Sequence, residues 1–586
     1  MKNSKSTNER KGSLDSIENQ KHILSEVNDQ LNDLIPHVET ISITTQKKSS
    51  LVGSSTPIYN KKCKVTVQRP GDQKAYQCGP STKRNKKSDS DASKEISKCK
   101  DEGLARLNLS KSLLQVLPSS IKELAANLTE LYLYCNKLIS LPDEIGNLYK
   151  LEILMVQENS LTKLPDKLIN CTKLRMLDVR HNKLCQIPPV IYKLENLTHL
   201  LLRFNRIGTV DEDISQLNNL QVLNLGENKI HNLPNSPGLG ALTNLCTLDL
   251  SHNHLESLPE EIGNCINLVT LNLQHNELRC LPERIGELLN LKRLGLKYNQ
   301  FTNLPTSLSN CSAMETLNIE GNNIYQLSEG LLSHLKLTNI ILSRNSFTTF
   351  PTGGPTQFLN VQTVNMEHNE ISKIPFGIFS RAQHLTTLTL NDNQITALPP
   401  DQIRLSSGLV DLNLGTNHLT KLPDDIEHLV NLEVLILSNN KLKRIPSSIQ
   451  GLKKLVILDL EENNLEVLPP EIGNLTELQR LIVQSNSLVQ LPRTIGNLTN
   501  LVYLAAGENE LQSIPPEIGN LSNLDNLYLN DNWNLHELPV ELANCSSLHL
   551  MSIENCPLTK IPIEIVNAGP SLVIQYLRLH GSFIQN

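Results

Sequence analysis

The chain has 586 residues, of which 39% are apolar and 3% aromatic, and its formal net charge at pH 7 is −6. No apolar run reaches the roughly 18 residues that span a membrane, so an integral membrane protein is not expected. Residues 1–100 carry 19 Lys and Arg against 11 Asp and Glu, a balance of +8, which leaves −14 for residues 101–586. This asymmetry predicts a basic arm attached to an acidic body.

The arm, residues 1 to about 95, is rich in Ser, Lys and Asn, and we expect it to be mostly disordered. Within its segment 14–41, apolar residues recur every seven positions at Ile17, Leu24, Leu31 and Val38. Two interpretations stay open: a short coiled-coil or partner helix, and a helix that forms only transiently. Pro36 lies inside the segment and weakens the first interpretation.

A basic stretch, Lys-Arg-Asn-Lys-Lys, runs from Lys83 to Lys87. It is either a nuclear address or a solvated stretch that flanks the fold. The first residues of the chain are polar and lack the apolar stretch of a secretory signal. We therefore expect a cytoplasmic protein, with the nucleus as a second compartment if the basic stretch is an address.

From about residue 102 to 563 the sequence repeats. Equivalent asparagines are spaced by 23 residues at Asn136, Asn159, Asn182, Asn205 and Asn228, and each ends the frame Leu-x-Leu-x-x-Asn. The series continues to Asn532, and variants of the frame at both ends bring the count to about 20 repeats. This period and signature are those of the leucine-rich repeat. The leucines of one repeat cannot form a core alone, so they stack on the next, and the asparagine satisfies backbone groups where the chain leaves the strand.

The fold predicted from this pattern is an α/β leucine-rich-repeat solenoid. It is a horseshoe with a parallel sheet on the concave side and short helices on the convex side, preceded by the disordered N-terminal arm. In a typical repeat, residues 141–148 read Leu-Pro-Asp-Glu-Ile-Gly-Asn-Leu. The proline suits the first turn of a short helix, and we expect the glycine to let that helix end tightly.

Two breaks in the period are informative. The interval from Asn228 to Asn253 is 25 residues long and contains an irregular segment, 235–240. Three successive intervals of 24 follow Asn345. We expect both breaks to bulge on the convex side or to change the local curvature.

The ends of the array need covers for their exposed leucines. We expect the segment from Glu95 to Leu104 to form a short capping helix and residues 564–586 to form the C-terminal cap and tail. The predicted regions are the arm at 1–95, the solenoid at 96–563 and the cap at 564–586.

The twelve cysteines form no terminal cluster and no Cys-x-x-Cys pair. Four of them follow an asparagine at the place where sister repeats carry leucine, namely Cys171, Cys265, Cys311 and Cys545. They are typical of small buried hydrophobic residues in a reduced protein. A structural zinc site is the weaker alternative.

In each frame the three x residues point away from the leucine core, so their chemistry is the best indication of partners. Up to Asn299 they include Tyr132, Tyr134, Glu158, Asp178, Arg180, His181, Arg203, Phe204, Lys297 and Tyr298. From Asn322 onward, acidic residues dominate, among them Glu367, Asp392, Asp459, Glu461, Glu462, Glu508 and Asp531. The concave face is therefore expected to be aromatic and arginine-bearing first and acidic later, a protein-binding surface that would repel nucleic acid.

Catalysis has no sequence support. We find no glycine-rich phosphate loop and no nucleophile elbow, and we expect a non-enzyme without a cofactor. His252 and His275 occupy equivalent positions in neighbouring repeats and are the nearest approach to a metal pair. Two histidines without a third ligand make a metal site the minor alternative.

Several stretches resemble the Shoc/Soc/Sur-type scaffolds of the Ras–Raf pathway. They are residues 130–138, 175–184, 365–369, 373–382, 527–532 and 551–558, and the similarity covers about 95–580. The resemblance implies a non-enzymatic scaffold that joins a GTP-bound Ras-type GTPase (M-Ras) to the catalytic subunit of protein phosphatase 1. The complex would dephosphorylate Raf kinases and promote MAP kinase signalling. A generic Ras-group repeat adaptor with a different protein partner is the alternative.

The resemblance and the polarity of the concave face together suggest two sets of contact residues. The expected GTPase-binding residues are Tyr132, Tyr134, Arg180, Arg203, Lys297 and Tyr298. The expected phosphatase-binding residues on the array are Glu158, Asp178, Glu320, Asp459, Glu461 and Glu462.

The arm departs from the family pattern. Relatives carry a phosphatase-docking segment of the Arg/Lys-Val-x-Phe type, whose apolar pair enters two pockets as an added strand. The nearest match here is Lys64, Val65, Thr66 and Val67, with valine where an aromatic residue is expected. We therefore expect Lys64, Val65 and Val67 to dock the phosphatase weakly, at a loss of about 1–3 kcal/mol.

Overall fold

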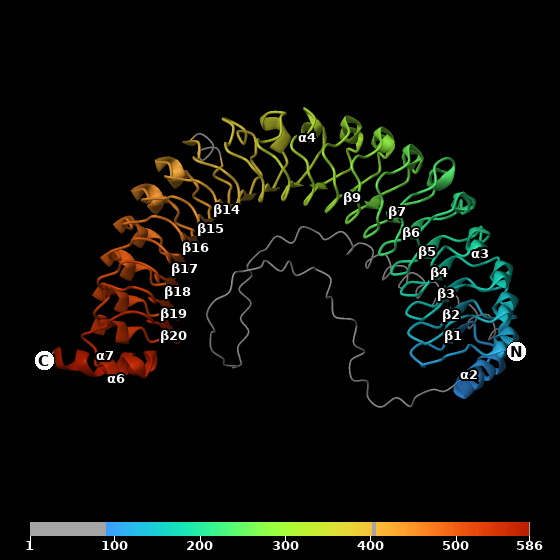
Figure 1. Ribbon diagram of the computed structural model, residues 1–586, viewed down its shortest axis with the longest axis horizontal. Helices are drawn as coiled ribbons and strands as arrows, with labels where there is room; N and C mark the ends of the chain where they lie inside the picture. Colours follow the sequence, from blue (N-terminus) through green and yellow to red (C-terminus); the bar gives the residue numbers. More distant parts are fainter. Residues whose placement is uncertain (1–88, 401–405, 585–586) are drawn as a thin grey trace, which may run out of the picture.

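The computed structural model describes residues 89–400 and 406–584. Its strands form one parallel sheet that lines the inner side of an open arc, with the described ends of the chain at opposite ends of the arc (Figure 1). The predicted leucine-rich-repeat solenoid is confirmed. The predicted arm, including the heptad-like segment 14–41, the basic stretch at 83–87 and the docking segment at 64–67, lies outside the described residues.

The strands are three residues long and one belongs to each repeat. They are β1 (Arg106–Asn108), β2 (Glu130–Tyr132), β3 (Ile153–Met155), β4 (Met176–Asp178), β5 (His199–Leu201), β6 (Val222–Asn224), β7 (Thr247–Asp249), β8 (Thr270–Asn272), β9 (Arg293–Gly295), β10 (Thr316–Asn318), β11 (Asn339–Ile341), β12 (Thr363–Asn365), β13 (Thr387–Thr389), β14 (Asp411–Asn413), β15 (Val434–Ile436), β16 (Ile457–Asp459), β17 (Arg480–Ile482), β18 (Tyr503–Ala505), β19 (Asn526–Tyr528) and β20 (Leu550–Ser552). Each pairs in parallel with the next along the chain, and the frame leucines are in register, as Leu131, Leu154 and Leu177 show.

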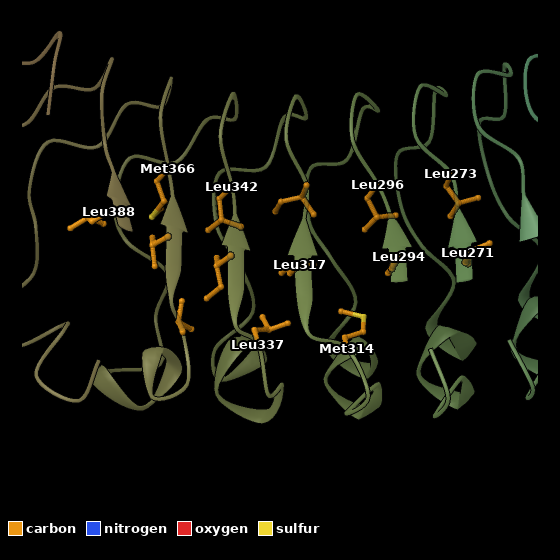
Figure 2. Packing of buried hydrophobic residues seen from close by; sticks show 14 of the residues in the cluster. Leu271, Leu273, Leu294, Leu296, Met314, Leu317, Leu337, Leu342, Met366 and Leu388 are labelled. Atoms are coloured by element: carbon orange, nitrogen blue, oxygen red, sulfur yellow. The ribbon is translucent and has the colours of Figure 1, made fainter. Parts of the chain in front are cut away.

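The leucines of the frame form a continuous core between the sheet and the convex side. Figure 2 shows Leu271 and Leu273 of one repeat beside Leu294 and Leu296 of the next, and all four are at most 3% exposed. Burying a leucine side chain stabilises a fold by roughly 1.5–3 kcal/mol. Since each repeat finds its partners only in its neighbours, the stability of the array is a sum over adjacent repeats.

The asparagine of the frame joins neighbouring repeats through hydrogen bonds, as predicted. Asn182 Nδ2 donates to the carbonyls of Val156 (3.0 Å) and Val179 (3.1 Å), and its Oδ1 accepts from the Leu161 amide at 2.9 Å. The residue before it, His181, has a φ of 51°. That left-handed turn directs the chain off the strand while the asparagine satisfies the buried backbone groups.

The convex side carries mostly single-turn 3-10 helices. They are η1 (Ser119–Leu124), η2 (Asp143–Asn147), η3 (Asp166–Asn170), η4 (Glu212–Gln216), η5 (Gly238–Ala241), η6 (Glu260–Asn264), η7 (Glu283–Glu287), η8 (Thr306–Asn310), η9 (Pro355–Phe358), η10 (Asp424–His428), η11 (Ser447–Gly451), η12 (Pro470–Asn474), η13 (Arg493–Asn497), η14 (Pro516–Asn520) and η15 (Val540–Asn544). Two short α-helices, α3 (Pro189–Tyr192) and α4 (Leu331–His334), occupy the same place in their repeats.

The expected role of the repeat glycine is wrong. Gly146 lies inside η2 without a left-handed φ, so it does not end the helix. A Cβ at this position would lie 2.2 Å from the Lys167 carbonyl oxygen of the next repeat. The glycine is therefore needed for the close approach of adjacent convex turns.

Both breaks in the period are accommodated outside the sheet. The register passes without interruption from β6 to β7 and from β11 through β13. After Asn345 the longer repeats bury Phe350, Phe358 and Phe379, whose rings pack 5.1–5.7 Å apart. The longer repeats of the second break thus add aromatic side chains to the apolar layer behind the strands.

A helix covers each end of the described array. At the start, α2 (Asp89–Asp101) buries Ala92, Ile96 and Cys99 against the first repeat, and it begins six residues before the expected capping segment. At the end, α6 (Ile563–Asn567) leads into α7 (Pro570–Ile584), which buries Val573 and Leu577. Among the described helices, none has the length and apolar character needed to cross a membrane.

The four cysteines of the Asn-Cys pairs are buried, as predicted. Cys171, Cys265, Cys311 and Cys545 are at most 5% exposed, and each thiol donates to a carbonyl of the preceding repeat, as Cys171 does to Ile145 at 3.4 Å. Burial raises the pKa of the Cys171 thiol to about 12. These thiols therefore pack as small apolar groups.

Candidate protein-binding surface

The concave face is built from the strand residues between the frame leucines and from the two residues that precede each frame asparagine. Since parallel strands lie about 4.8 Å apart, equivalent residues of successive repeats stand in rows. The interactions along these rows decide which of the predicted contact residues are accessible.

The first strands carry an apolar cluster on this face. We define the concave apolar cluster as Tyr132, Ile153, Met155, Met176, Leu201 and Val222, with half-buried Tyr134 packed against it. All six are at most 8% exposed because neighbouring rows pack against one another. The expectation that Tyr132 is exposed is therefore wrong.

Tyr132 is held by two charged neighbours. Its hydroxyl donates to Glu130 at 2.8 Å, and the Arg106 guanidinium lies 4.5 Å above its ring. Burial, followed by the hydrogen bond to Glu130, raises the pKa of Tyr132 above its usual range. Tyr134 lies closer to solvent and is the more accessible of the two predicted tyrosines.

The sequence predicts different partners for Arg180 and Asp178, but the structure pairs the two side chains. Arg180 Nη2 lies 2.7 Å from Asp178 Oδ2, and Nε lies 3.0 Å from Oδ1. The Asp178 side chain is fully buried and that of Arg180 is 22% exposed. The carboxylate therefore orients the guanidinium and is itself not exposed to a partner.

Arg203 and Phe204 form the centre of a second group. The Phe204 ring stacks on His181 with centroids 4.2 Å apart, and the Arg203 guanidinium lies 4.9 Å from the Phe204 ring. Arg203 Nη2 also lies 3.6 Å from Glu227. Phe204 is 39% exposed, so this group offers a partner an aromatic face beside a positive charge.

Buried Asp249 adds a carboxyl group near Arg203 that the sequence does not single out. It accepts hydrogen bonds from the Ser251 hydroxyl (2.7 Å) and amide (3.0 Å). Burial raises the pKa of Asp249, and the charge of Arg203 opposes the effect. Its place in the frame, as the last residue of β7, was the available signal, because the equivalent last residue of β4 is Asp178.

The third group joins residues for which the sequence also predicts different partners. Glu320 accepts a hydrogen bond from the Tyr298 hydroxyl at 2.8 Å and lies 3.0 Å from Lys297 Nζ. Arg344 Nε lies 3.7 Å from the same carboxylate. Burial raises and the Lys297 charge lowers the pKa of Glu320, and the net shift is downward, so the carboxylate stays charged.

Tyr298 also ends a stack of rings. The ring centroids of His252 and His275 lie 4.1 Å apart, and those of His275 and Tyr298 lie 4.6 Å apart. Burial, with a contribution from His252, lowers the pKa of His275 to about 4. In the described chain no group of three or more His, Cys, Asp or Glu side chains is arranged to hold a metal ion.

The remaining predicted contacts lie in two places, and the Glu158 charge acts on the pKa of both Arg180 and His181 in the neighbouring repeat. Glu158 is exposed on the rim beside β3 and accepts from the Cys135 thiol at 2.9 Å. Asp459, Glu461 and Glu462 lie together at β16, far along the arc. Burial raises the pKa of Asp459. Burial, together with the charges of Asp459 and Glu462, also raises the pKa of Glu461, as is expected where several carboxylates lie close together.

Family models place the repeats over much of the chain. A model described as a leucine-rich repeat region matches residues 204–348, 407–481 and 457–555, and one described as a leucine rich repeat matches 126–184 and 359–419.

Curated relatives share shorter segments. A leucine-rich repeat protein soc-2 homolog of Nematostella vectensis is 65% identical over 54 residues, 9% of each chain. The leucine-rich repeat protein SHOC-2 of Danio rerio is 59% identical over 54 residues, 9% of this chain and 10% of that protein. A leucine-rich repeat protein soc-2 homolog of Drosophila erecta is 55% identical over 89 residues, which are 15% of this chain and 13% of that protein. The resemblance to Shoc/Soc/Sur-type proteins is thus confirmed, on alignments that span about a tenth of the relatives' length.

Solved structures agree with the fold. The plant peptide hormone receptor RGFR1 in complex with RGF2 has a TM-score of 0.59 and 29% identity, and the match covers 79% of this chain and 86% of the receptor. YopM from Yersinia enterocolitica WA-314 has a TM-score of 0.57 and 25% identity, and the match covers 82% of this chain and 97% of YopM.

Proposed function

Because the chain belongs to the leucine-rich-repeat family, and its relatives are soc-2 and SHOC-2 proteins, we propose that it is a non-enzymatic scaffold of Ras signalling. In this proposal it joins a GTP-bound Ras-type GTPase (M-Ras) to the catalytic subunit of protein phosphatase 1. The resulting complex dephosphorylates Raf kinases and promotes MAP kinase signalling in the cytoplasm, and in the nucleus if the basic stretch at 83–87 is an address.

The observation that carries the proposal is the 65% identity to a soc-2 homolog, and the chemistry of the concave face supports it. Arg203 lies beside exposed Phe204, and Arg180 is held by Asp178 just after β4; both arginines suit an acidic effector surface. The acidic residues at β16 suit a basic surface on a second partner. The two regions lie well apart on the arc (Figure 1), which supports separate sites for two proteins.

The same geometry refines the assignment of residues. Tyr134, Arg180, Arg203, Lys297 and Tyr298 are proposed to contact the GTPase. Asp178, Glu320 and Tyr132 are proposed to position these residues from beneath, since they are buried or paired with them. Glu158, Asp459, Glu461 and Glu462 remain the proposed phosphatase contacts on the array.

A pulldown of the full chain tests the proposal. Purified Ras-type GTPases loaded with a GTP analogue or GDP are offered with and without the phosphatase catalytic subunit. We expect both proteins to be retained together and only with the GTP form. Retention of neither protein, or equal retention of the GDP form, contradicts the scaffold.

Two variants separate the partners within the same assay. Arg203→Ala is expected to reduce GTPase retention, with Arg493→Ala on η13, whose side chain is 83% exposed, as the matched control. A Glu461→Lys, Glu462→Lys double variant is expected to reduce phosphatase retention, with Glu471→Lys on η12 as the control. If each variant affects both partners equally, the division of the face is wrong.

The degenerate docking segment favours a second candidate. With Val67 in the place of an aromatic anchor, the chain would bind a Ras-group GTPase without the phosphatase and serve as an adaptor for another protein. GTP-dependent retention of the GTPase without any phosphatase supports this alternative.

A further inference from the structure

A hollow of about 470 Å³ opens at the rim of the array, where the chain leaves β17, β18 and β19. Its lining residues are Asn486, Glu508, Asn509, Glu510, Asp531 and Trp533. Trp533 is the only tryptophan of the chain and is 67% exposed. It directly follows Asn532 of the frame, where the solenoid core makes no demand for an aromatic residue.

The carboxylates of the hollow are bonded to neutral donors. Glu508 accepts from Gln484 Nε2 (3.1 Å) and the Ser485 hydroxyl (2.8 Å). Asp531 accepts from the side-chain amides of Asn555 (2.7 Å) and Asn530 (2.9 Å). Within the described ranges, neither carboxylate forms an ion pair, so their negative charges remain uncompensated there.

The surroundings strengthen this negative potential. Glu461 lies in the field of Glu508, Asp459 and Glu462, all of which oppose its ionisation. Asp531 occupies the position in the next repeat that is equivalent to Glu508, and Glu510 adds a third carboxylate to the hollow. A cation that enters is therefore attracted by several groups at once.

The same fold already shows how it accommodates a guanidinium. Arg106 lies 4.5 Å above the Tyr132 ring and 3.8 Å from Glu130, between an aromatic face and a carboxylate. Arg480 lies 4.3 Å above Tyr503 in the strand next to the hollow. The Trp533 hollow offers the same two components, a ring and carboxylates, to a group from outside.

We propose that the Trp533 hollow binds the arginine side chain of a basic peptide segment on a partner protein. The guanidinium stacks on the indole face while its N–H groups donate to Asp531 and Glu508. Arginine fits better than lysine because its planar group can stack and donate to a carboxylate pair at the same time. The site lies outside the predicted GTPase and phosphatase contacts and does not depend on the proposed function.

Trp533 reports on the site directly, because the fluorescence of the full chain above 295 nm excitation comes from this single indole. The probe is the peptide acetyl-Gly-Arg-Gly-amide, and the control is the same peptide with neutral citrulline. We expect a saturable change in Trp533 emission with the arginine peptide in the millimolar range, and none with citrulline. An added 0.5 M NaCl should weaken the binding of the arginine peptide, because the interaction is partly ionic.

Two variants test whether the Glu508 and Asp531 carboxylates bind the arginine side chain. Glu508→Gln and Asp531→Asn are each expected to raise the dissociation constant roughly two- to fivefold. Glu471→Gln on the convex helix η12 is the matched control and should leave it unchanged. The proposal is overturned if emission does not respond, if citrulline acts equally, or if the two rim variants bind as tightly as the unmodified chain. If a variant loses its far-UV circular dichroism, the salt dependence of the unmodified chain decides: no weakening by NaCl contradicts the proposal.

Discussion

The Arg180 guanidinium is held by Asp178 through paired contacts, with Nη2 at 2.7 Å from Oδ2 and Nε at 3.0 Å from Oδ1. Two residues separated by one position in the chain can meet in this way because Asp178 ends β4 and Arg180 begins the turn that follows. The exposed part of Arg180 is therefore presented in one orientation. A charge held in this way binds a partner at a smaller loss of side-chain entropy.

We expect Asp178→Ala to destabilise the fold by about 2–4 kcal/mol. Removing one member of a buried ion pair costs roughly 3–5 kcal/mol, and the partial exposure of Arg180 reduces that loss. Urea denaturation followed by circular dichroism measures the change. Glu195→Ala, at an exposed position of the neighbouring repeat, is the control and should shift the midpoint little. A midpoint for Asp178→Ala equal to that of the control would show that the pair does not stabilise the array.

Much of the fold could be predicted from the sequence because a repeated constraint is easy to detect. The leucines at every frame position and the asparagine after each strand point to one geometry, and residues such as Asn182 make the predicted hydrogen bonds. The buried cysteines and the capping helices also follow from what an array must cover. The role of Gly146 could not be predicted, because its close contact with Lys167 depends on the position of the next repeat.

The details of the concave face could be predicted less well. The frame predicts exposure for a residue that points away from the core, yet Tyr132 and Asp178 are buried by neighbours in the adjacent rows. Partners 22 or 23 positions apart, such as Tyr298 and Glu320, become adjacent only when repeats are aligned and their side chains are placed. Charge alone therefore assigned members of the same pair to different proteins.

Gly321→Ala is expected to displace Tyr298. A Cβ at Gly321 would lie 2.4 Å from Tyr298 Cδ1, and the glycine has a φ of 70°. Other repeats carry non-glycine residues with a similar φ at this position, so the clash with the ring is the larger effect. We expect the variant to remain folded and to bind the GTP-loaded GTPase more weakly, by roughly tenfold if Tyr298 is a central contact. Gly208→Ala, where a Cβ meets nothing within 4 Å, should bind normally.

The unusual pKa of His275 predicts a dependence of stability on pH. Burial lowers this pKa from 6.5 to about 4, so the folded protein disfavours the charged imidazole. Well above pH 6.5 the His275 imidazole is neutral in both the folded and the unfolded chain, so the stability of the fold is not reduced by this group. Between pH 6.5 and 4 the unfolded chain gains a proton that the folded chain does not, so stability falls.

His275→Gln should therefore reduce the loss of melting temperature between pH 7 and pH 5. His252 stacks on His275 and its pKa is also lowered, mainly by burial, so part of the dependence will remain. His384→Gln, at an exposed position, is the control. Equal losses in His275→Gln and the unmodified chain would show that His275 titrates normally in the folded state.

Restoring the aromatic anchor of the docking segment should strengthen phosphatase binding. In Val67→Phe the segment reads Lys-Val-Thr-Phe, which has the apolar and aromatic pair that such segments insert into two pockets. A buried aromatic anchor contributes about 1–3 kcal/mol, so the affinity should rise by roughly five- to a hundredfold. Isothermal titration of the phosphatase catalytic subunit with the full chain measures the change, and Val52→Phe, elsewhere in the arm, controls for added hydrophobicity. If Val67→Phe binds no more tightly than Val52→Phe, the phosphatase does not use this segment, and any binding must come from the acidic residues at β16.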